Sequence, residues 1–206
     1  MAVAAPDRLY FTDSDEANEL LATDPLALLI GFALDQQVPV PTAFLGPLKI
    51  KQRLGTLAIA SRDPAEVEAA FRETPAVHRF PGSMATRVQD LCALVDEEYG
   101  GDASRLWREA SDSDDLRKRI AALPGFGEMK IKALSAVLSK RFGVKAAEGL
   151  TPSHPTLGDV DSREKLDWYQ EKKRAYKAKT RARAADQEGR PGSAGAAGPN
   201  MRAEKT

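Results

Sequence analysis

Apolar residues recur at three- and four-residue spacing along most of the chain, in stretches that begin near Asp, Ser or Pro. This spacing is typical of amphipathic helices, and Asp-Pro is a signal for a helix start. No stretch alternates in the way a β-strand does, so the sequence predicts an all-α fold. One predicted helix follows Asp13, and the others cover residues 25–36, 41–54 with a candidate break at Gly46-Pro47, 63–72, 82–99, 103–109, 113–122 and a stretch that ends at Phe142.

The pattern changes after Phe142. Gly and Pro interrupt residues 143–160, which predicts a loop. A helical domain is therefore predicted over residues 1–162, followed by a basic helix over residues 163–186. Residues 187–206 are rich in Gly, Ala and Pro and contain too little apolar surface to fold, so a disordered tail is predicted there.

Charge is balanced over the whole chain but is distributed unevenly along it. Lys and Arg together number 30, as do Asp and Glu, so net charge predicts no partner. Residues 1–35 carry seven acids and one base, whereas residues 163–183 carry nine bases and three acids. The two segments can attract each other within the fold. The second can also follow a nucleic-acid backbone, since Trp168, Tyr169 and Tyr176 stand among its cations.

Cys92 is the only cysteine, which excludes a disulfide framework and a four-cysteine iron–sulfur site. His78 and His154 are the only histidines, and we interpret them as a helix-end residue and a loop residue rather than as metal ligands. The N-terminus lacks the pattern of a signal peptide, and the longest apolar run, residues 26–34, is too short to span a bilayer. We expect a cytoplasmic protein that contacts no membrane, associated with the nucleoid if it is bacterial.

The stretch LPGFGEMKIKAL, residues 123–134, places Pro-Gly-Phe-Gly between two helical patterns. Glycine leaves no Cβ to block a close approach, so the amides of Gly125, Gly127 and the next helical turn can point outward together. Such a helix N-terminus binds anions, and a DNA phosphate is one. Lys130 and Lys132 add positive charge near the same edge. An ordinary corner between two helices would use the same residues, so this motif alone leaves both interpretations open.

Four motifs together resemble the helix-hairpin-helix base-excision DNA glycosylase superfamily, which is also named for its Gly/Pro-rich loop and Asp. They occur in the family's order over residues 26–162, and each is weak by itself. The motifs are LLIGFALDQQVPVPTAF (28–44), HRFPGSMATRVQDLCALV (78–95), the Pro-Gly-Phe-Gly hairpin (within 113–142) and GLTPSHPTLGDVDS (149–162). The resemblance implies a two-lobed helical fold with double-stranded, damaged DNA bound between the lobes, and hydrolysis of a base–sugar bond. It implies a short, monomeric member without an iron–sulfur cluster, and it allows a monovalent cation at the hairpin carbonyls.

The resemblance also assigns DNA-binding residues. Gln37 matches the glutamine that fills the gap left by a flipped-out base, and Gln36 precedes it in the same motif. An amide suits this role because it can both donate and accept hydrogen bonds. Gly125, Phe126 and Gly127 match the hairpin that contacts the phosphate backbone.

The catalytic assignments follow from the same comparison. Met129 stands where the bifunctional branch has a nucleophilic lysine, and Lys130 lies about 100° further round the helix, so it should point elsewhere. We therefore expect no lyase activity. The carboxylate that supports hydrolysis should be Asp161 or Asp159; Val160-Asp161-Ser162 is more similar to the family's Val-Asp-Thr, and Asp161 could also simply cap the last helix.

Two other functions fit the same residues. A DNA-binding protein could keep the hairpin without catalysis, which Met129 and the long interval to Asp161 favour. A helical protein-interaction domain could use the acidic N-terminus and the basic helix as contact surfaces.

Overall fold

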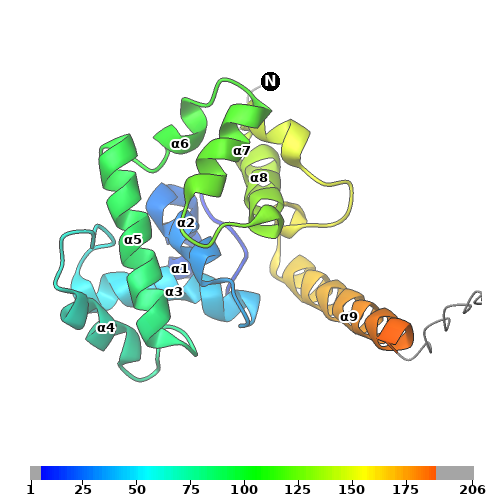
Figure 1. Ribbon diagram of the computed structural model, residues 1–206, viewed down its shortest axis with the longest axis horizontal. Helices are drawn as coiled ribbons and strands as arrows, with labels where there is room; N and C mark the ends of the chain where they lie inside the picture. Colours follow the sequence, from blue (N-terminus) through cyan, green and yellow to red (C-terminus); the bar gives the residue numbers. More distant parts are fainter. Residues whose placement is uncertain (1–5, 189–206) are drawn as a thin grey trace, which may run out of the picture. The chain divides into compact units, whose positions relative to one another are not determined.

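The computed structural model describes residues 6–188, and every regular element in that range is helical (Figure 1). This confirms the all-α prediction for the described part of the chain. The α-helices are α1 (Asp15–Thr23), α2 (Pro25–Leu34), α3 (Val40–Leu54), α4 (Pro64–Arg72), α5 (Pro81–Tyr99), α6 (Arg105–Arg108), α7 (Ser113–Ala122), α8 (Glu128–Phe142) and α9 (Arg163–Glu188). Two short 3-10 helices, η1 (Lys145–Leu150) and η2 (Leu157–Asp159), lie in the segment that the sequence predicted as a loop.

Helix starts follow the predicted capping residues. Asp24 accepts hydrogen bonds from two amides of α2, and Asp63 accepts one from α4, which satisfies amides that have no partner inside the helix. Two boundaries differ from the predictions. Helix α2 ends at Leu34, so Gln36 lies in a turn rather than in the helix, and α3 continues through Pro47 without a break.

The helices of residues 6–170 pack in two groups. In the first, which we call the N-terminal group, α2 packs on α1, α3 and α5, and α4 packs on α3 and α5. In the second, the hairpin group, α7 packs on α6, α8 and η1, and α8 packs on η1 and η2. Figure 1 shows α7 and α8 side by side, joined by the turn that contains Pro-Gly-Phe-Gly.

The core of the N-terminal group depends on aromatic packing and on close contact between helices. Phe44 of α3 makes edge-to-face contacts with Phe11 and Phe32, with ring centroids 4.9 and 5.1 Å apart. Such contacts add about 0.5–1.5 kcal/mol to the burial of each ring. A side chain at Gly31 would collide with the Phe44 ring, and one at Gly46 with Leu34, so these two glycines allow α2 and α3 to approach.

Contacts divide the chain into two units, residues 1–170 and residues 171–206. The boundary falls within α9, so the first turns of this helix belong to the first unit. The predicted disordered tail lies outside the described residues except for 187 and 188, which belong to α9. Among the described helices, none alone is long and apolar enough to cross a membrane; α1 and α2 satisfy that criterion only as a pair, and they meet at a 114° bend.

Candidate nucleic-acid interface

The turn that follows α2 has an unusual backbone conformation. Gln37 has φ of 58°, and it is the one non-glycine residue with positive φ among the described residues. A left-handed conformation costs a residue with a Cβ roughly 1–2 kcal/mol. Gln37 is also exposed. Contacts from other parts of the chain must therefore hold this turn, residues 35–38, which we call the glutamine turn.

His78 provides one of these contacts. Its side chain is 2% exposed; its Nε2 lies 3.0 Å from the carbonyl oxygen of Gln36, and the amide of Phe80 donates to its Nδ1 at 3.1 Å. A carbonyl can only accept and an amide N–H can only donate, so the imidazole is neutral with its hydrogen on Nε2. Burial lowers the pKa of His78, the carbonyls of Gln36 and Leu34 oppose this, and the charges of Arg79 and Arg87 lower it further.

Arg87 of α5 connects the glutamine turn with the hairpin. Its guanidinium donates a short hydrogen bond to the side-chain oxygen of Gln36. The same side chain passes beside Gly125, where an added Cβ would lie 3.0 Å from Arg87 Cδ and Nε. Gly125 has φ of 78°, so both its conformation and this close contact favour glycine.

Lys130 of α8 provides the second connection. Its Nζ donates to the carbonyl oxygen of Ala33 in α2 at 2.9 Å and lies 5.4 Å from the centre of the Phe126 ring. Burial lowers the pKa of Lys130 to about 8, although the charge of Asp35 raises it and that of Arg87 lowers it. The ammonium therefore points inward, toward the end of α2, and not to the exposed edge where the sequence placed it. Met129, by contrast, is 75% exposed.

The outer side of the hairpin remains accessible. Gly127 precedes α8, is exposed, and has no atom within 4 Å of the position that a Cβ would take. Lys132 is exposed as well. Glu128 in the first turn of α8 forms an ion pair with Arg117, which reduces its repulsion of an anion at this helix N-terminus.

The two candidate carboxylates have different surroundings. Asp159 is partly buried; it accepts hydrogen bonds from Lys140 Nζ at 2.7 and 2.9 Å and from the amide and hydroxyl of Thr156 at 2.8 and 3.0 Å. Burial alone would raise the pKa of Asp159, but the bonds from Lys140 and Thr156 lower it below its usual value. Asp161 is exposed and has a 3.4 Å ion pair with Lys165.

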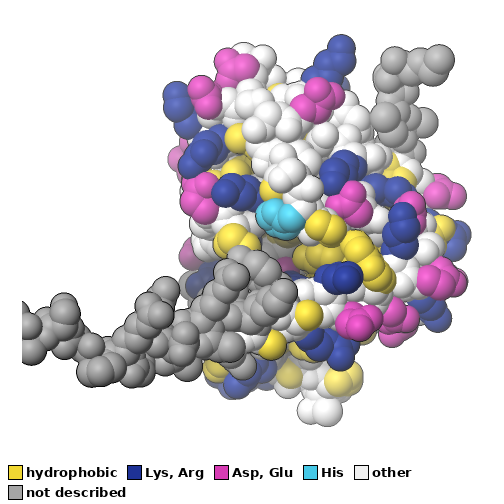
Figure 2. All heavy atoms as spheres, turned by 90° about the vertical axis from the view of Figure 1, so that its right-hand side faces the viewer, with side chains coloured by type: hydrophobic (Ala, Val, Ile, Leu, Met, Phe, Trp, Pro, Cys, Tyr) yellow, Lys and Arg dark blue, Asp and Glu magenta, His cyan; other side chains and the backbone are white. Residues whose placement is uncertain are grey.

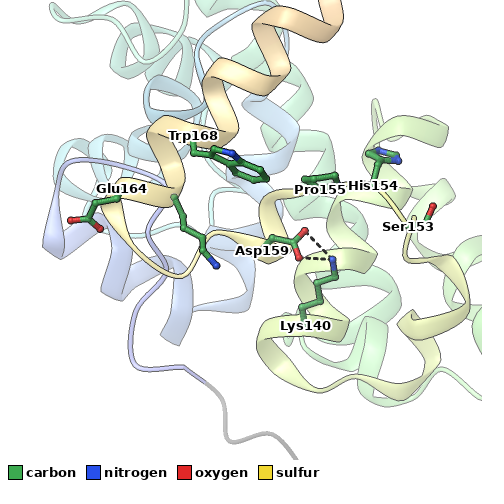
Figure 3. Close-up of a pocket in the computed structure, with 8 residues that line it drawn as sticks. Lys140, Ser153, His154, Pro155, Asp159, Glu164 and Trp168 are labelled. Carbon is green, nitrogen blue, oxygen red and sulfur yellow. Dashed lines mark hydrogen bonds and ion pairs between the residues drawn. The ribbon is translucent and has the colours of Figure 1, made fainter.

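Asp159 also lies at a pocket of about 580 Å³ (Figure 3). The Asp159–Lys140 pair lies between α8 and the start of α9, with the Trp168 ring nearby. The remaining lining residues are Ser153, His154, Pro155, Glu164 and Lys165. On the face shown in Figure 2, hydrophobic side chains gather in one patch beside a histidine, while acidic and basic side chains alternate around it.

Tyr169, near the start of α9, is within range of the charges of both Asp35 in the glutamine turn and Asp159. Burial, together with the charges of Asp35 and Asp159, raises the pKa of Tyr169 to about 12. Lys130 and Lys140 are ten residues apart on α8, which corresponds to about 15 Å along the helix. The structure therefore brings Gln36, Gly125, Phe126 and Lys130 together, and it places Asp159 of η2 beside Lys140, further along α8.

Sequence reasoning missed three residues of this region. Arg87 lies in the 78–95 motif but was given no role, Tyr169 was considered only as an aromatic residue of the basic helix, and His78 was interpreted as a helix-end residue. His78 and Arg87 bond to Gln36, which lies 42 and 51 positions away in the sequence, respectively. Only the apolar spacing of α5 could have indicated that Arg87 lies beside the core.

Comparisons with protein-family models, with curated proteins and with solved structures give no match for this chain. Within residues 6–188, no group of three or more His, Cys, Asp or Glu side chains is arranged to hold a metal ion. The residues above are therefore interpreted from their own geometry.

Proposed function

We propose that this protein binds double-stranded, damaged DNA and hydrolyses the bond between a damaged base and its sugar, as a helix-hairpin-helix DNA glycosylase of the base-excision repair pathway. One observation carries the proposal: the strained, exposed Gln37 lies in a turn that Arg87 connects to the Pro-Gly-Phe-Gly hairpin, and Lys130 of α8 bonds to Ala33 at the end of α2, just before that turn. Strained residues that their surroundings hold in place are concentrated at functional sites.

The division into an N-terminal group and a hairpin group supports a two-lobed fold of the glycosylase type. Arg87 and Lys130 lie where the two groups meet, so a DNA duplex placed there would reach both the hairpin amides and Gln37. The hairpin would contact backbone phosphates and the Gln37 amide would pair with the base that has lost its partner. We expect the protein to act as a monomer in the cytoplasm, without an iron–sulfur cluster; a monovalent cation at the hairpin carbonyls is part of the same hypothesis.

Asp159 fits the hydrolytic role better than Asp161 does. Stabilisation of a developing oxocarbenium ion requires a carboxylate with a fixed direction and restricted solvent access. Asp159 has three hydrogen-bonding partner groups and lies at a pocket, whereas Asp161 is exposed. The lowered pKa keeps Asp159 ionised at neutral pH.

Lyase chemistry is not part of the proposal. Met129 has no amine, and the amine of Lys130 is hydrogen-bonded to Ala33. Borohydride should therefore trap no covalent complex between the protein and DNA. A trapped complex that disappears in Lys130→Ala would show that the proposal is wrong on this point.

Release of bases from a panel of lesion-containing duplexes tests the activity, and a gel shift at several salt concentrations tests the binding. Base release that depends on Asp159 supports the proposal. A non-catalytic DNA-binding protein is the second candidate, because Lys140 and Thr156 already occupy both oxygens of Asp159. Salt-dependent binding with no base release would favour it, and no binding to any duplex would exclude both.

A further inference from the structure

His78 joins two exposed side chains that are far apart in the sequence. Through Nε2 it holds the carbonyl of Gln36, the residue before Gln37, and through Nδ1 it holds the amide of Phe80. Phe80 is 42% exposed, which makes it one of three large hydrophobic side chains exposed in the described part of the chain. The same buried ring thus contacts the backbone of Phe80 itself and the backbone of Gln36, the direct neighbour of Gln37.

Phe80 is placed to contact a nucleobase. Its backbone is the N-cap of α5, so the start of a long helix fixes its position. The guanidinium of Arg79 lies 4.8 Å from the centre of its ring, and the His78 ring lies 5.9 Å away on a tilted plane. An exposed aromatic ring with a neighbouring cation is a common platform for stacking an unpaired base, since every base has an aromatic face and the adjoining phosphate is anionic.

We propose that His78 is a positioning residue that fixes Gln37 and Phe80 as one DNA-contacting unit, in which Gln37 pairs with an orphaned base and Phe80 stacks against a neighbouring one. This rests on the proposed DNA binding. The two bonds of the imidazole hold the backbone carbonyl of Gln36 and the backbone amide of Phe80 at a fixed separation. Loss of either bond releases one contact and leaves the other in place.

Two substitutions separate the two bonds. The amide of Gln in His78→Gln can reach the position of Nε2 and donate to Gln36, but it leaves the amide of Phe80 without an acceptor. The amide oxygen of Asn in His78→Asn can take the place of Nδ1 and accept from Phe80, but it cannot reach Gln36. Each variant should therefore reproduce one of the direct variants Phe80→Ala and Gln37→Ala.

The probes are a duplex with a tetrahydrofuran abasic analogue, the matching intact duplex, and a duplex with 2-aminopurine next to the abasic analogue. His78→Asn should lose preference for the abasic over the intact duplex, as Gln37→Ala does. His78→Gln should lose the 2-aminopurine fluorescence change on binding, as Phe80→Ala does. The preference for the abasic duplex and the 2-aminopurine fluorescence change should each fall by roughly two- to tenfold, the effect of one hydrogen bond.

Gln89→Met is the matched control. Gln89 lies on α5, the helix that follows His78, and its side chain donates to two loop carbonyls, those of Ile59 and Arg62, at 3.3 and 2.7 Å. Loss of these two hydrogen bonds should lower the stability of the protein about as much as the His78 substitutions do, without changing either DNA measurement. The inference fails if both His78 variants bind DNA as the wild type does. It also fails if the two His78 variants and Gln89→Met all lose both the preference for the abasic duplex and the 2-aminopurine fluorescence change. If the wild type binds none of the duplexes, the proposed function itself fails.

A measurement on the wild-type protein covers the case in which the variants do not fold. Nitrogen NMR of the histidine side chains should show His78 as the Nε2–H tautomer. Protonation of Nδ1 would place a hydrogen against the Phe80 amide, so the 2-aminopurine signal should fall with acid at the pH where His78 itself titrates. The groups around the ring are Arg79, Arg87 and the carbonyls of Gln36 and Leu34. An Nδ1–H tautomer, or a signal independent of His78 titration, would overturn the inference.

Discussion

The glutamine turn and the Thr156–Asp161 segment both carry a predicted functional residue, but they are held in different ways. The glutamine turn has a strained backbone at Gln37, and its stabilising contacts come from distant residues such as His78 and Arg87. In the segment around Asp159, Thr156 and Asp159 form a capping box three residues apart, and the Asp159 side chain takes one further hydrogen-bonding partner, Lys140, from another element.

The difference shows how each region can respond to a ligand. A turn held by remote side chains can change when one of those side chains moves, so its conformation depends on how the two helical groups meet. A segment held by its own hydrogen bonds keeps its geometry. The first arrangement suits a residue that enters DNA, and the second suits a carboxylate that must not move during a reaction.

The largest expected effect concerns the two aspartates. Asp159→Asn should reduce base release by about a hundredfold or more, as expected when a catalytic charge is removed, and Asp161→Asn should change it little. The measurement is single-turnover base release from the lesion duplex identified in the panel. The opposite ranking would show that Asp159 serves only the fold and that Asp161 carries the chemistry.

Lys140→Met provides a control that keeps the Asp159 carboxylate. Without the Lys140 cation the pKa of Asp159 rises, because burial then acts with less opposition. Base release should persist near neutral pH, and its loss on the acid side should move to higher pH. An unchanged acid limb would mean that Asp159 is not the group that titrates.

The next effect is on stability and tests whether the segment around Asp159 is rigid. A Cβ at Gly158 would lie 2.3 Å from the carbonyl oxygen of Ala136 in α8, which is backbone and cannot turn away. Gly158→Ala should therefore lower the free energy of unfolding by about 3 kcal/mol, at the upper end for overpacking a core. Thermal unfolding by circular dichroism measures it. If Gly158→Ala lowers the free energy of unfolding by no more than an ordinary surface substitution does, this segment can move away from α8.

These two regions also show what the sequence could predict. Helix starts at Asp24 and Asp63 depend on a side chain and amides two or three residues away, so local sequence was sufficient. The hairpin was predicted for the same reason. The burial of Lys130 was not, because it depends on where the end of α2 lies in space, 97 residues away in sequence.

A smaller effect concerns the exposed side of the hairpin. Gly127 has φ of −89° and open space around it, so Gly127→Ala should fold with nearly unchanged stability. If a phosphate approaches this amide, the added methyl group should weaken binding to every duplex by roughly three- to tenfold, about one hydrogen bond, with no change in lesion preference. Fluorescence anisotropy on intact and abasic duplexes measures this. Unchanged affinity in the folded variant would remove the hairpin amide from the interface.

A pH dependence of stability is expected from Lys130, which connects the hairpin with α2. Its pKa is about 8 in the folded protein and about 10.5 in the unfolded chain, its ordinary value. Between these values the unfolded chain binds the proton more tightly, so the contribution of Lys130 to stability rises with pH from about 8 to about 10.5. Lys130→Met lacks this group, so the wild type should gain stability relative to the variant across that window and not below it. Urea unfolding of both proteins at several pH values measures the difference. A constant difference from pH 7 to 11 would show that the Lys130 ammonium is solvated, and that α2 and the hairpin are not connected through it.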